Sequence, residues 1–294
     1  MSEPQPPLPE KRVTAKNLLT AAGVITVVQL VALLITDQNL PVYTTLVGIT
    51  GPSYAPAGTT LAGSALNAVL LVGFAFALTV VLVWLLKRRM VIVFKVLIFG
   101  SLAISAFTLT MVTADVFAVN LLPPAMEVPL EFGAPALVVA AMAYVIFVKD
   151  VPWLATLVLA FVGAEVGSFF AETLSPWTAL ALPIAFSIYD IYAVFRGPLK
   201  ALIGTNPGVA LVGMSIKAGE FTIGLGDVVF YTLLPSLALF QLYPTFGLLP
   251  AALTVLAIDA GMVVTLFLLS RKRLLPGLPI PMLLGILVIA GFLV

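Results

Sequence analysis

The sequence predicts an all-α, polytopic membrane protein with about nine transmembrane helices. Of its 294 residues, 62% are hydrophobic and only 9% are charged, and the mean hydropathy is +1.19. A water-soluble globule needs a far larger charged surface than this. The apolar residues also fall in runs of about 20, the length with which a helix crosses a hydrocarbon core of about 30 Å.

The breaks between the apolar runs set the expected spans. Prolines mark several of these breaks, because proline cannot continue a helix that arrives from its N-terminal side. Residues 1–16 are polar and proline-rich, and we expect a disordered cytosolic tail there, followed by a single transmembrane domain over 17–294. The nine expected spans cover residues 17–35, 60–86, 90–114, 132–148, 151–170, 177–195, 221–243, 246–270 and 276–294. Spans one to six thus occupy 17–195, and spans seven to nine occupy 221–294.

The positive charges predict how these spans are oriented. Lys and Arg gather at alternate breaks, as the positive-inside rule requires of cytosolic loops. The N-terminus and the 196–220 loop are therefore expected in the cytosol and the C-terminus outside, in a multi-pass protein of the cell membrane. The basic positions lie in 11–16, 87–89, 149, 196–217 and 271–273, with Lys95 near the inner end of the third span.

The absence of whole residue types excludes several chemistries. The chain has no Cys and no His, so it cannot form a thiol nucleophile, a Ser-His-Asp relay, or a zinc site with thiolate or imidazole ligands. We expect no cofactor and no metal. The net charge of +1, without a basic stripe, gives no support to nucleic-acid binding. Acid–base chemistry is left to carboxylates, lysines and tyrosines.

Four carboxylates lie inside the expected spans: Glu165, Asp190, Asp227 and Asp259. An acidic side chain at the bilayer centre costs about 2.5–3.5 kcal/mol on insertion scales, so each is a candidate for function. For Glu165 and Asp259 we favour a structural role, a hydrogen bond between helices.

Asp190 and Asp227 are expected at matching depth. Asp190 precedes Arg196 by six positions and Asp227 follows Glu220 by seven, which puts both about 10 Å below the inner surface. Consecutive antiparallel helices tend to be neighbours, so the two side chains are predicted to face each other. Two carboxylates in a low-dielectric site tend to hold a single proton, the state in which they can activate water against a peptide bond.

Two further segments depart from regular helix. Gly224 and Gly226 just before Asp227 permit close contact with another chain, although helix packing is the more common use of such glycines. The stretch 275–281 contains three prolines and cannot be helical throughout, so it is expected to line a polar cavity or to be buried in protein.

The 196–220 loop leaves two interpretations open. After a predicted turn over 204–208, the apolar residues 209–216 favour either a short strand at the membrane surface or a tucked-in hydrophobic loop. A strand would offer its free edge to an extended substrate, which suits peptide hydrolysis because a helical peptide bond is poorly accessible.

Three motifs together resemble the presenilin and signal peptide peptidase family of intramembrane aspartyl proteases. Tyr189-Asp190 is similar to the family's YD motif in the sixth span, Gly224-Leu225-Gly226-Asp227 to its GxGD motif in the seventh, and Pro276-Gly277-Leu278 to its PAL motif at the ninth. The resemblance implies that Asp190 and Asp227 are the catalytic pair. It also implies a supporting site made of Tyr189, Gly224, Leu225, Gly226, Pro276, Gly277 and Leu278.

The resemblance further implies cleavage of single-span membrane proteins or peptides within the lipid bilayer, without a cofactor and without required accessory subunits. A cytosolic N-terminus and a short 196–220 loop resemble a microbial, archaeal presenilin homologue, in which self-cleavage of that loop should not be assumed. One residue departs from the family pattern, because Gly277 stands where the motif has Ala. We expect this exchange of small residues to be tolerated.

The strongest alternative is a proton- or cation-coupled transporter or channel in which the buried acids carry protons or bind cations. Broken helices and glycines suit both functions, and flux through purified protein in liposomes would favour transport. A purely structural role requires two costly aspartates to be retained for packing alone. Prepilin and preflagellin peptidases also carry a GxGD motif, but they lack this YD motif and the late Pro motif.

Overall fold

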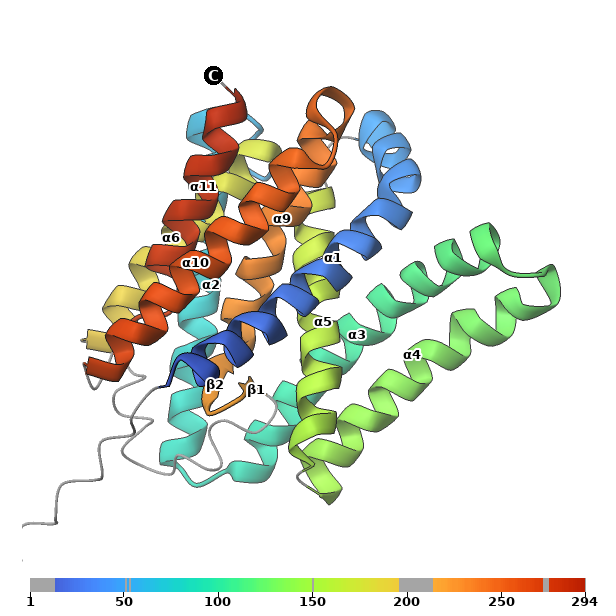
Figure 1. Ribbon diagram of the computed structural model, residues 1–294. Helices are drawn as coiled ribbons and strands as arrows, with labels where there is room; N and C mark the ends of the chain where they lie inside the picture. Colours follow the sequence, from blue (N-terminus) through green and yellow to red (C-terminus); the bar gives the residue numbers. More distant parts are fainter. Residues whose placement is uncertain are drawn as a thin grey trace, which may run out of the picture.

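The structure, a computed structural model, describes residues 14–50, 52, 54–149, 151–195, 214–271 and 275–293. Within these residues, eight helices are long and apolar enough to cross a membrane, and one further apolar helix is shorter. The predicted all-α, multi-pass fold is therefore confirmed (Figure 1). Nearly all of the expected tail and most of the 196–220 loop lie outside the described residues.

The helices follow the predicted order, with shifts at several ends. Figure 1 shows them as one bundle, in which the first described residues of α1 and the C-terminus lie at opposite ends. The helices are α1 Ala15–Thr50, α2 Leu61–Lys87, α3 Val91–Leu121, η1 Pro124–Met126, α4 Glu127–Ala143, the π-helix η2 Tyr144–Val148, α5 Pro152–Thr173, α6 Pro176–Phe195, α9 Leu225–Phe246, α10 Leu249–Arg271 and α11 Pro279–Leu293.

The first helix is much longer than its predicted span. We expected it to end at residue 35, but α1 continues to Thr50 and includes Pro41. The polar residues that suggested an end are accommodated because the helix still packs against α5 there. Asn39 is buried, and the hydroxyl oxygens of Thr36 and Ser168 lie 2.6 Å apart. Hydropathy could not predict this continuation, because it scores the polarity of each residue without its hydrogen-bond partner on another helix.

The seventh span is preceded by a β-hairpin. Strand β1 (Ser215–Ala218) pairs antiparallel with β2 (Phe221–Gly224), and the turn between them contains Gly219 at φ +63°. The prediction that helix begins at residue 221 is wrong, because aromatic and β-branched residues favour a strand there and α9 begins only at Leu225. The strand expected within 209–216 is observed only at its end, and residues 209–213 lie outside the described residues.

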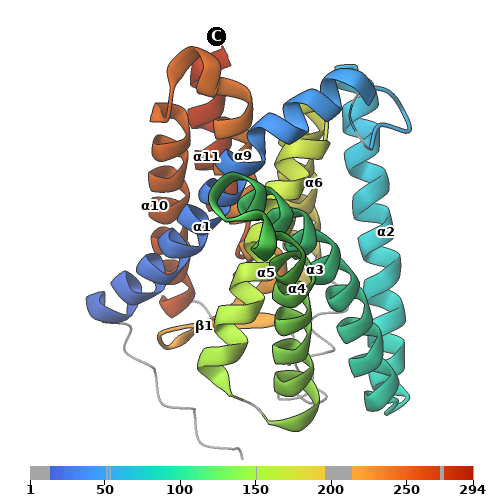
Figure 2. The ribbon, with the colours of Figure 1, turned by 90° about the vertical axis from the view of Figure 1, so that its right-hand side faces the viewer.

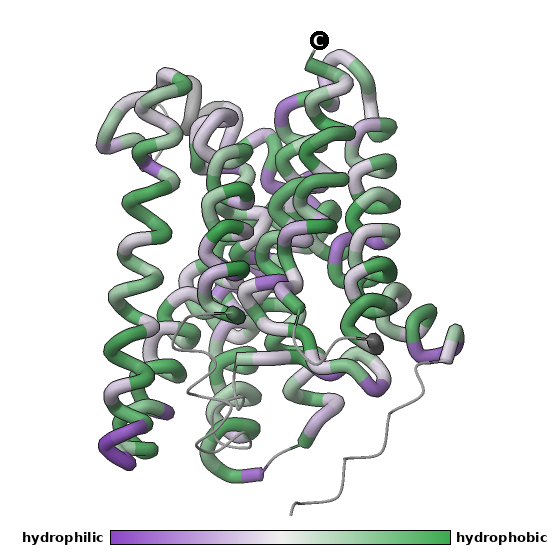
Figure 3. Tube along the Cα trace, turned by 90° about the vertical axis from the view of Figure 1, so that its left-hand side faces the viewer, coloured by the Kyte–Doolittle hydropathy of each residue, from purple (hydrophilic) through white to green (hydrophobic). Residues whose placement is uncertain are grey.

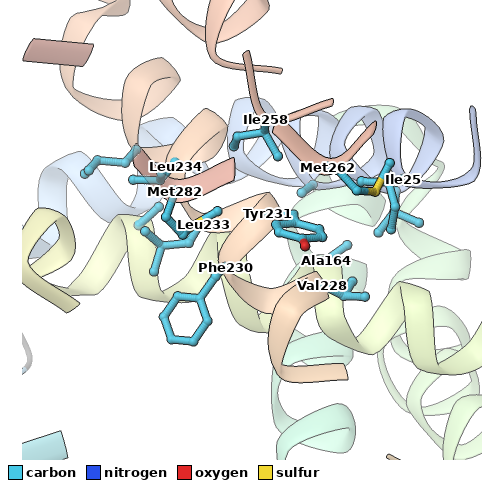
Figure 4. Packing of buried hydrophobic residues seen from close by; sticks show 14 of the residues in the cluster. Ile25, Ala164, Val228, Phe230, Tyr231, Leu233, Leu234, Ile258, Met262 and Met282 are labelled. Carbon is cyan, nitrogen blue, oxygen red and sulfur yellow. The ribbon is translucent and has the colours of Figure 1, made fainter. Parts of the chain in front are cut away.

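Helix α9 forms the centre of the bundle. It contacts α1, α5, α6, α10 and α11, and its residues from Phe230 to Phe240 are buried. Figure 4 shows side chains of α9 packed against those of α1, α5, α10 and α11. Gly163 and Gly167 of α5, one turn apart, let the backbones of α5 and α9 approach closely, as small residues do in membrane helix pairs.

The outer surface of the bundle is apolar. Phe74, Ile92 and Leu137 are each more than 70% exposed, which a soluble monomer would avoid over so wide a surface. Figure 3 shows hydrophobic residues along the length of the helices and hydrophilic ones at the turn between α2 and α3. Helix α2 stands at one edge of the bundle, beside α6 and α3 (Figure 2).

Candidate active site

Asp190 and Asp227 approach one short non-helical segment from different helices. Asp190 lies near the end of α6, and Asp227 lies in the first turn of α9. The segment is residues 275–278, which connects to α11. Its Leu278 backbone N–H donates to Asp190 Oδ2 at 3.1 Å, and the neighbouring Gly277 amide is directed at the same carboxylate.

The same segment touches Asp227. A Cβ atom added to Gly277 would lie 2.8 Å from Asp227 Oδ2 and 3.3 Å from its Cγ, so the carboxylate rests directly on the backbone of Gly277. Because Gly277 and Leu278 are adjacent, the two aspartates share one site, and their charges are near enough to interact. The proline-rich stretch, predicted not to be helical throughout, is non-helical over 275–278 and contacts both carboxylates.

Tyr231 is a site residue that the sequence reasoning did not include. Its side chain is 3% exposed, and its hydroxyl donates to the Gly277 carbonyl oxygen at 3.1 Å. Tyr231 follows Asp227 by four residues, so the two side chains lie on one face of α9. This spacing was the signal that could have found it.

The supporting residues divide into two groups. Gly277, Leu278 and Gly224 contact the aspartates, since a Cβ at Gly224 would lie 3.4 Å from Asp227 Oδ2. At Gly226, which directly precedes Asp227, a Cβ would meet nothing within 4 Å outside its chain neighbours, so the space there is open. The remaining members act on the surroundings. Pro276 is buried within the segment, and the Leu225 N–H donates to the Met214 carbonyl oxygen at 2.8 Å, which joins the start of α9 to the hairpin.

Tyr189 precedes Asp190 but its hydroxyl is bonded elsewhere. The hydroxyl donates to Thr79 Oγ1 of α2 at 3.1 Å, and the ring packs edge-on against Phe76 and Phe186. Consecutive helical residues point about 100° apart, so an aspartate facing the centre places its neighbour against another helix. Tyr189 therefore fixes α6 to α2.

The other acids within the spans are bonded to side chains of neighbouring helices, away from this site. Asp259 of α10 accepts hydrogen bonds from Thr26 Oγ1 at 2.6 Å and Gln29 Nε2 at 2.8 Å, both on α1. Glu165 of α5 accepts one from Thr110 of α3 at 2.8 Å. Both arrangements agree with the predicted bond across helices. Glu172, also buried, had been placed beyond the end of the fifth span, which continues to Thr173.

The β-hairpin has one occupied edge. The Lys217 N–H donates to Thr156 Oγ1 of α5 at 3.0 Å, and the same hydroxyl approaches the Lys217 carbonyl oxygen at 3.4 Å. The backbone N–H and C=O of Lys217 thus point away from β2. Lys217 pairs with Thr222, so in an antiparallel ladder the backbone of Thr222 points outward from the opposite edge. The hairpin edge that faces away from α5 is therefore that of β2.

A separate groove of about 620 Å³ lies between α1 and α5. Its lining is apolar apart from Thr20 and Thr156, and neither aspartate contributes to it.

Comparison with known proteins identifies the relatives of this chain. The Presenilin family model matches residues 17–207. Presenilin-B of Dictyostelium discoideum is 39% identical over 125 residues, which are 39% of this chain and 25% of that protein. A presenilin homologue of Drosophila melanogaster is 30% identical over 146 residues, which are 47% of this chain and 26% of that protein. The matched region thus spans about a quarter of the length of either relative.

A solved structure shares the fold. It is that of a presenilin family intramembrane aspartate protease, with a TM-score of 0.64 at 18% sequence identity. The match covers 94% of this chain and 98% of the other.

Proposed function

The chain belongs to the presenilin family, and on this premise we propose that it is an intramembrane aspartyl endopeptidase of the GxGD type with Asp190 and Asp227 as its catalytic pair. The observation that carries the proposal is the contact of one non-helical segment with both carboxylates, through the Leu278 N–H and the Gly277 backbone. The solved neighbour with this fold is an intramembrane aspartate protease, which adds support.

The proposed reaction uses one proton shared by the pair. The ionised aspartate takes a proton from water while the water oxygen attacks the peptide carbonyl carbon, and the protonated aspartate donates its proton to the carbonyl oxygen. The diol collapses when the aspartate that took the proton from water passes it to the nitrogen, the other aspartate takes a proton from a diol hydroxyl, and the C–N bond breaks. An amine and a carboxylic acid are released, and the pair again holds one proton. The two aspartates titrate as a pair, so the acid and base roles belong to the pair and not to one residue.

The residues around the pair supply positioning. The amide of Leu278, the residue before α11, holds Asp190, and Tyr231 of α9 holds the carbonyl of Gly277. The segment is therefore fixed from the same helix that carries Asp227. Such fixed placement is what lets a catalytic group act without first reorganising.

We further propose that a substrate strand pairs with the edge of β2 at Thr222. The edge of β1 is occupied by Thr156 at Lys217, while Thr222 is exposed and its backbone points away from β1. Strand β2 ends at Gly224, three residues before Asp227. A substrate unwound onto this edge would bring its peptide bonds toward the aspartates in the extended form that hydrolysis requires.

The remaining parts of the proposal concern setting and partners. The substrates are single-span membrane proteins or peptides, and no accessory subunit is required. The N-terminus and the hairpin face the cytosol, in a multi-pass protein of the cell membrane, as the positive-inside pattern supports.

The test compares wild type with Asp190→Asn, Asp227→Asn and the matched control Asp259→Asn. Each purified protein is incubated with a single-span reporter peptide in detergent, and the products are identified by mass spectrometry. We expect wild type and the control to cut within the apolar segment, and both dyad variants to lose more than about 1,000-fold in rate. Cutting by either dyad variant would refute the mechanism. If none of the four proteins cuts the peptide and the wild type carries ions across liposome membranes, the transporter function would be favoured.

A further inference from the structure

A second polar cluster lies between α1 and α5, away from the proposed catalytic pair. It consists of Thr36 and Asn39 of α1 and Ser168 and Glu172 of α5. All four side chains are buried, with exposed fractions of 0%, 4%, 0% and 1%. The proposed chemistry does not use them, so their presence in an apolar bundle needs a separate reason.

The hydrogen bonds within the cluster do not satisfy all of its oxygen atoms. The hydroxyls of Thr36 and Ser168 lie 2.6 Å apart, and Ser168 Oγ donates to Glu172 Oε1 at 2.7 Å. The amide of Asn39 also reaches Glu172. Within the described residues, Glu172 Oε2 and Asn39 Oδ1 have no hydrogen-bond partner. Unsatisfied buried oxygens are costly, so something in the native membrane must satisfy them.

Neither helix supplies a positive charge to this carboxylate. The sequence has no Lys or Arg between Lys16 and Lys87, nor between Lys149 and Arg196. The titratable side chain that faces Glu172 from the next turn of α1 is Tyr43, which is neutral in its usual form. An ionised carboxylate buried without a counter-charge is strongly unfavourable.

We infer that Thr36, Asn39, Ser168 and Glu172 form a binding site for one sodium ion. Carboxylate, amide and hydroxyl oxygens are the ligands that hard cations prefer. One monovalent ion would neutralise the single carboxylate, whereas a divalent ion would leave a buried net charge. Glu172 Oε2 and Asn39 Oδ1, which have no hydrogen-bond partner among the described residues, would bind the ion.

Bound sodium would join α1 to α5, because each helix contributes two of the four ligands. Helix α5 packs in turn on α9 through Gly163 and Gly167, and α9 carries Asp227. The site therefore couples sodium to the frame that holds the catalytic pair, without touching it.

Glu165 provides an internal control, because it is a buried glutamate on the same helix with a poorer oxygen set. It is 2% exposed and has one hydroxyl partner, Thr110. One hydroxyl and one carboxylate do not surround an ion.

The experiment measures thermal unfolding of the full chain in detergent, in sodium, potassium or choline chloride at one ionic strength. We expect sodium at 100 times its Kd to raise the Tm of wild type and Glu165→Gln by about 5 °C over choline. Glu172→Gln should show no such rise. Ser168→Ala, which loses one ligand, should weaken the sodium response by about 10-fold or more in concentration.

Binding of ²²Na⁺ to the same samples gives a readout that does not depend on unfolding. Equal Tm values for wild type in the three salts, together with no ²²Na⁺ retained, would overturn the inference. A sodium response that survives Glu172→Gln would also overturn it. If Glu172→Gln does not fold, the Ser168→Ala variant is the test. An unchanged sodium concentration dependence of its Tm would then overturn the inference. Because none of these measurements uses peptide cleavage, failure of the sodium site leaves the proposed protease function untouched.

Discussion

Two regions of this protein hold acidic side chains between helices. The two regions differ in the groups that contact the carboxylates. Around Asp190 and Asp227, the contacts come from the backbone of a non-helical segment at Gly277 and Leu278. Around Asp259, they come from two side chains of one neighbouring helix, at 2.6 and 2.8 Å. The first region requires a non-helical segment to bring backbone groups to the acids, and the second requires only two regular helices side by side.

The difference separates the pair that we propose to react from an acid that holds two helices together. A carboxylate bonded to a hydroxyl and an amide has its lone pairs engaged, and its partners are lost if it moves. The Asp227 carboxylate lies instead against the backbone of a glycine, which has no side chain to bond it. Depth in the membrane alone does not distinguish the two kinds, whereas the type of partner does.

After the substitutions of the two aspartates themselves, the largest effect is expected from Gly277→Ala, which restores the residue of the family motif. Its Cβ would lie 2.8 Å from Asp227 Oδ2, so the carboxylate must move, and a misplacement of about 1 Å can cost about 100-fold in rate. We expect kcat to fall by about 10- to 100-fold with Tm little changed. Gly291→Ala in α11, where a Cβ meets nothing within 4 Å, is the control.

Wild-type activity in Gly277→Ala would mean that the backbone contact does not position Asp227, and it would remove the main distinction between the two regions. It would also bear out the expectation that the exchange of Gly and Ala is tolerated here.

The next effect concerns stability. In Gly167→Ala the new Cβ would lie 2.7 Å from the Val229 carbonyl oxygen and 3.0 Å from the Leu233 nitrogen, and backbone atoms in a helix cannot easily give way. We expect a loss of about 1–3 kcal/mol, read as a lower Tm in detergent. Gly23→Ala in α1, with open space around it, should be neutral or stabilising. Equal Tm values for the two would show that α5 and α9 are not held as closely as described.

Asp259→Ala tests the helix-holding region. It removes the acceptor for Thr26 and Gln29, and such hydrogen bonds between membrane helices are worth about 0.6–1.7 kcal/mol. We expect a Tm a few degrees lower and unchanged kcat for the folded fraction. Loss of cleavage at unchanged Tm would break the comparison, because Asp259 would then belong with the reacting acids.

The smallest effect is expected from Thr79→Val, which removes the acceptor of the Tyr189 hydroxyl on α2 while it keeps the side-chain shape. We expect a loss of about 0.6 kcal/mol and no change in the cleavage site. Tyr189→Phe serves as the reciprocal variant, and a double-mutant cycle gives the coupling energy. A 100-fold drop in kcat for Thr79→Val would mean that Tyr189 acts on the aspartates after all.

Much of the fold follows from the sequence because hydropathy, proline and positive charge all mark the ends of membrane helices. These signals predicted the order of the helices and the break at 275–278. They failed where a tertiary contact decides the local structure. The continuation of α1 past residue 35 depends on contacts with α5, and the strand at 221–224 depends on pairing with 215–218. Neither partner is visible in a local window of sequence.

The candidate site was predictable in part. The approach of Asp190 and Asp227 followed from their distance to the ends of their helices. The pairing of Leu278 with Asp190 did not, because a backbone amide carries no sequence signature, and neither did the direction of the Tyr189 side chain toward α2. Glu172 was missed because its span was drawn too short by three residues.

The short helix α11 has a consequence for the surrounding lipid. Its 15 residues give a rise of about 22 Å, less than the roughly 30 Å of a hydrocarbon core. Such hydrophobic mismatch is relieved by local thinning of the bilayer. The segment that touches both aspartates lies directly before the first residue of α11. Thinning of the bilayer at this end of the helix would shorten the path of water from the aqueous phase to the carboxylates.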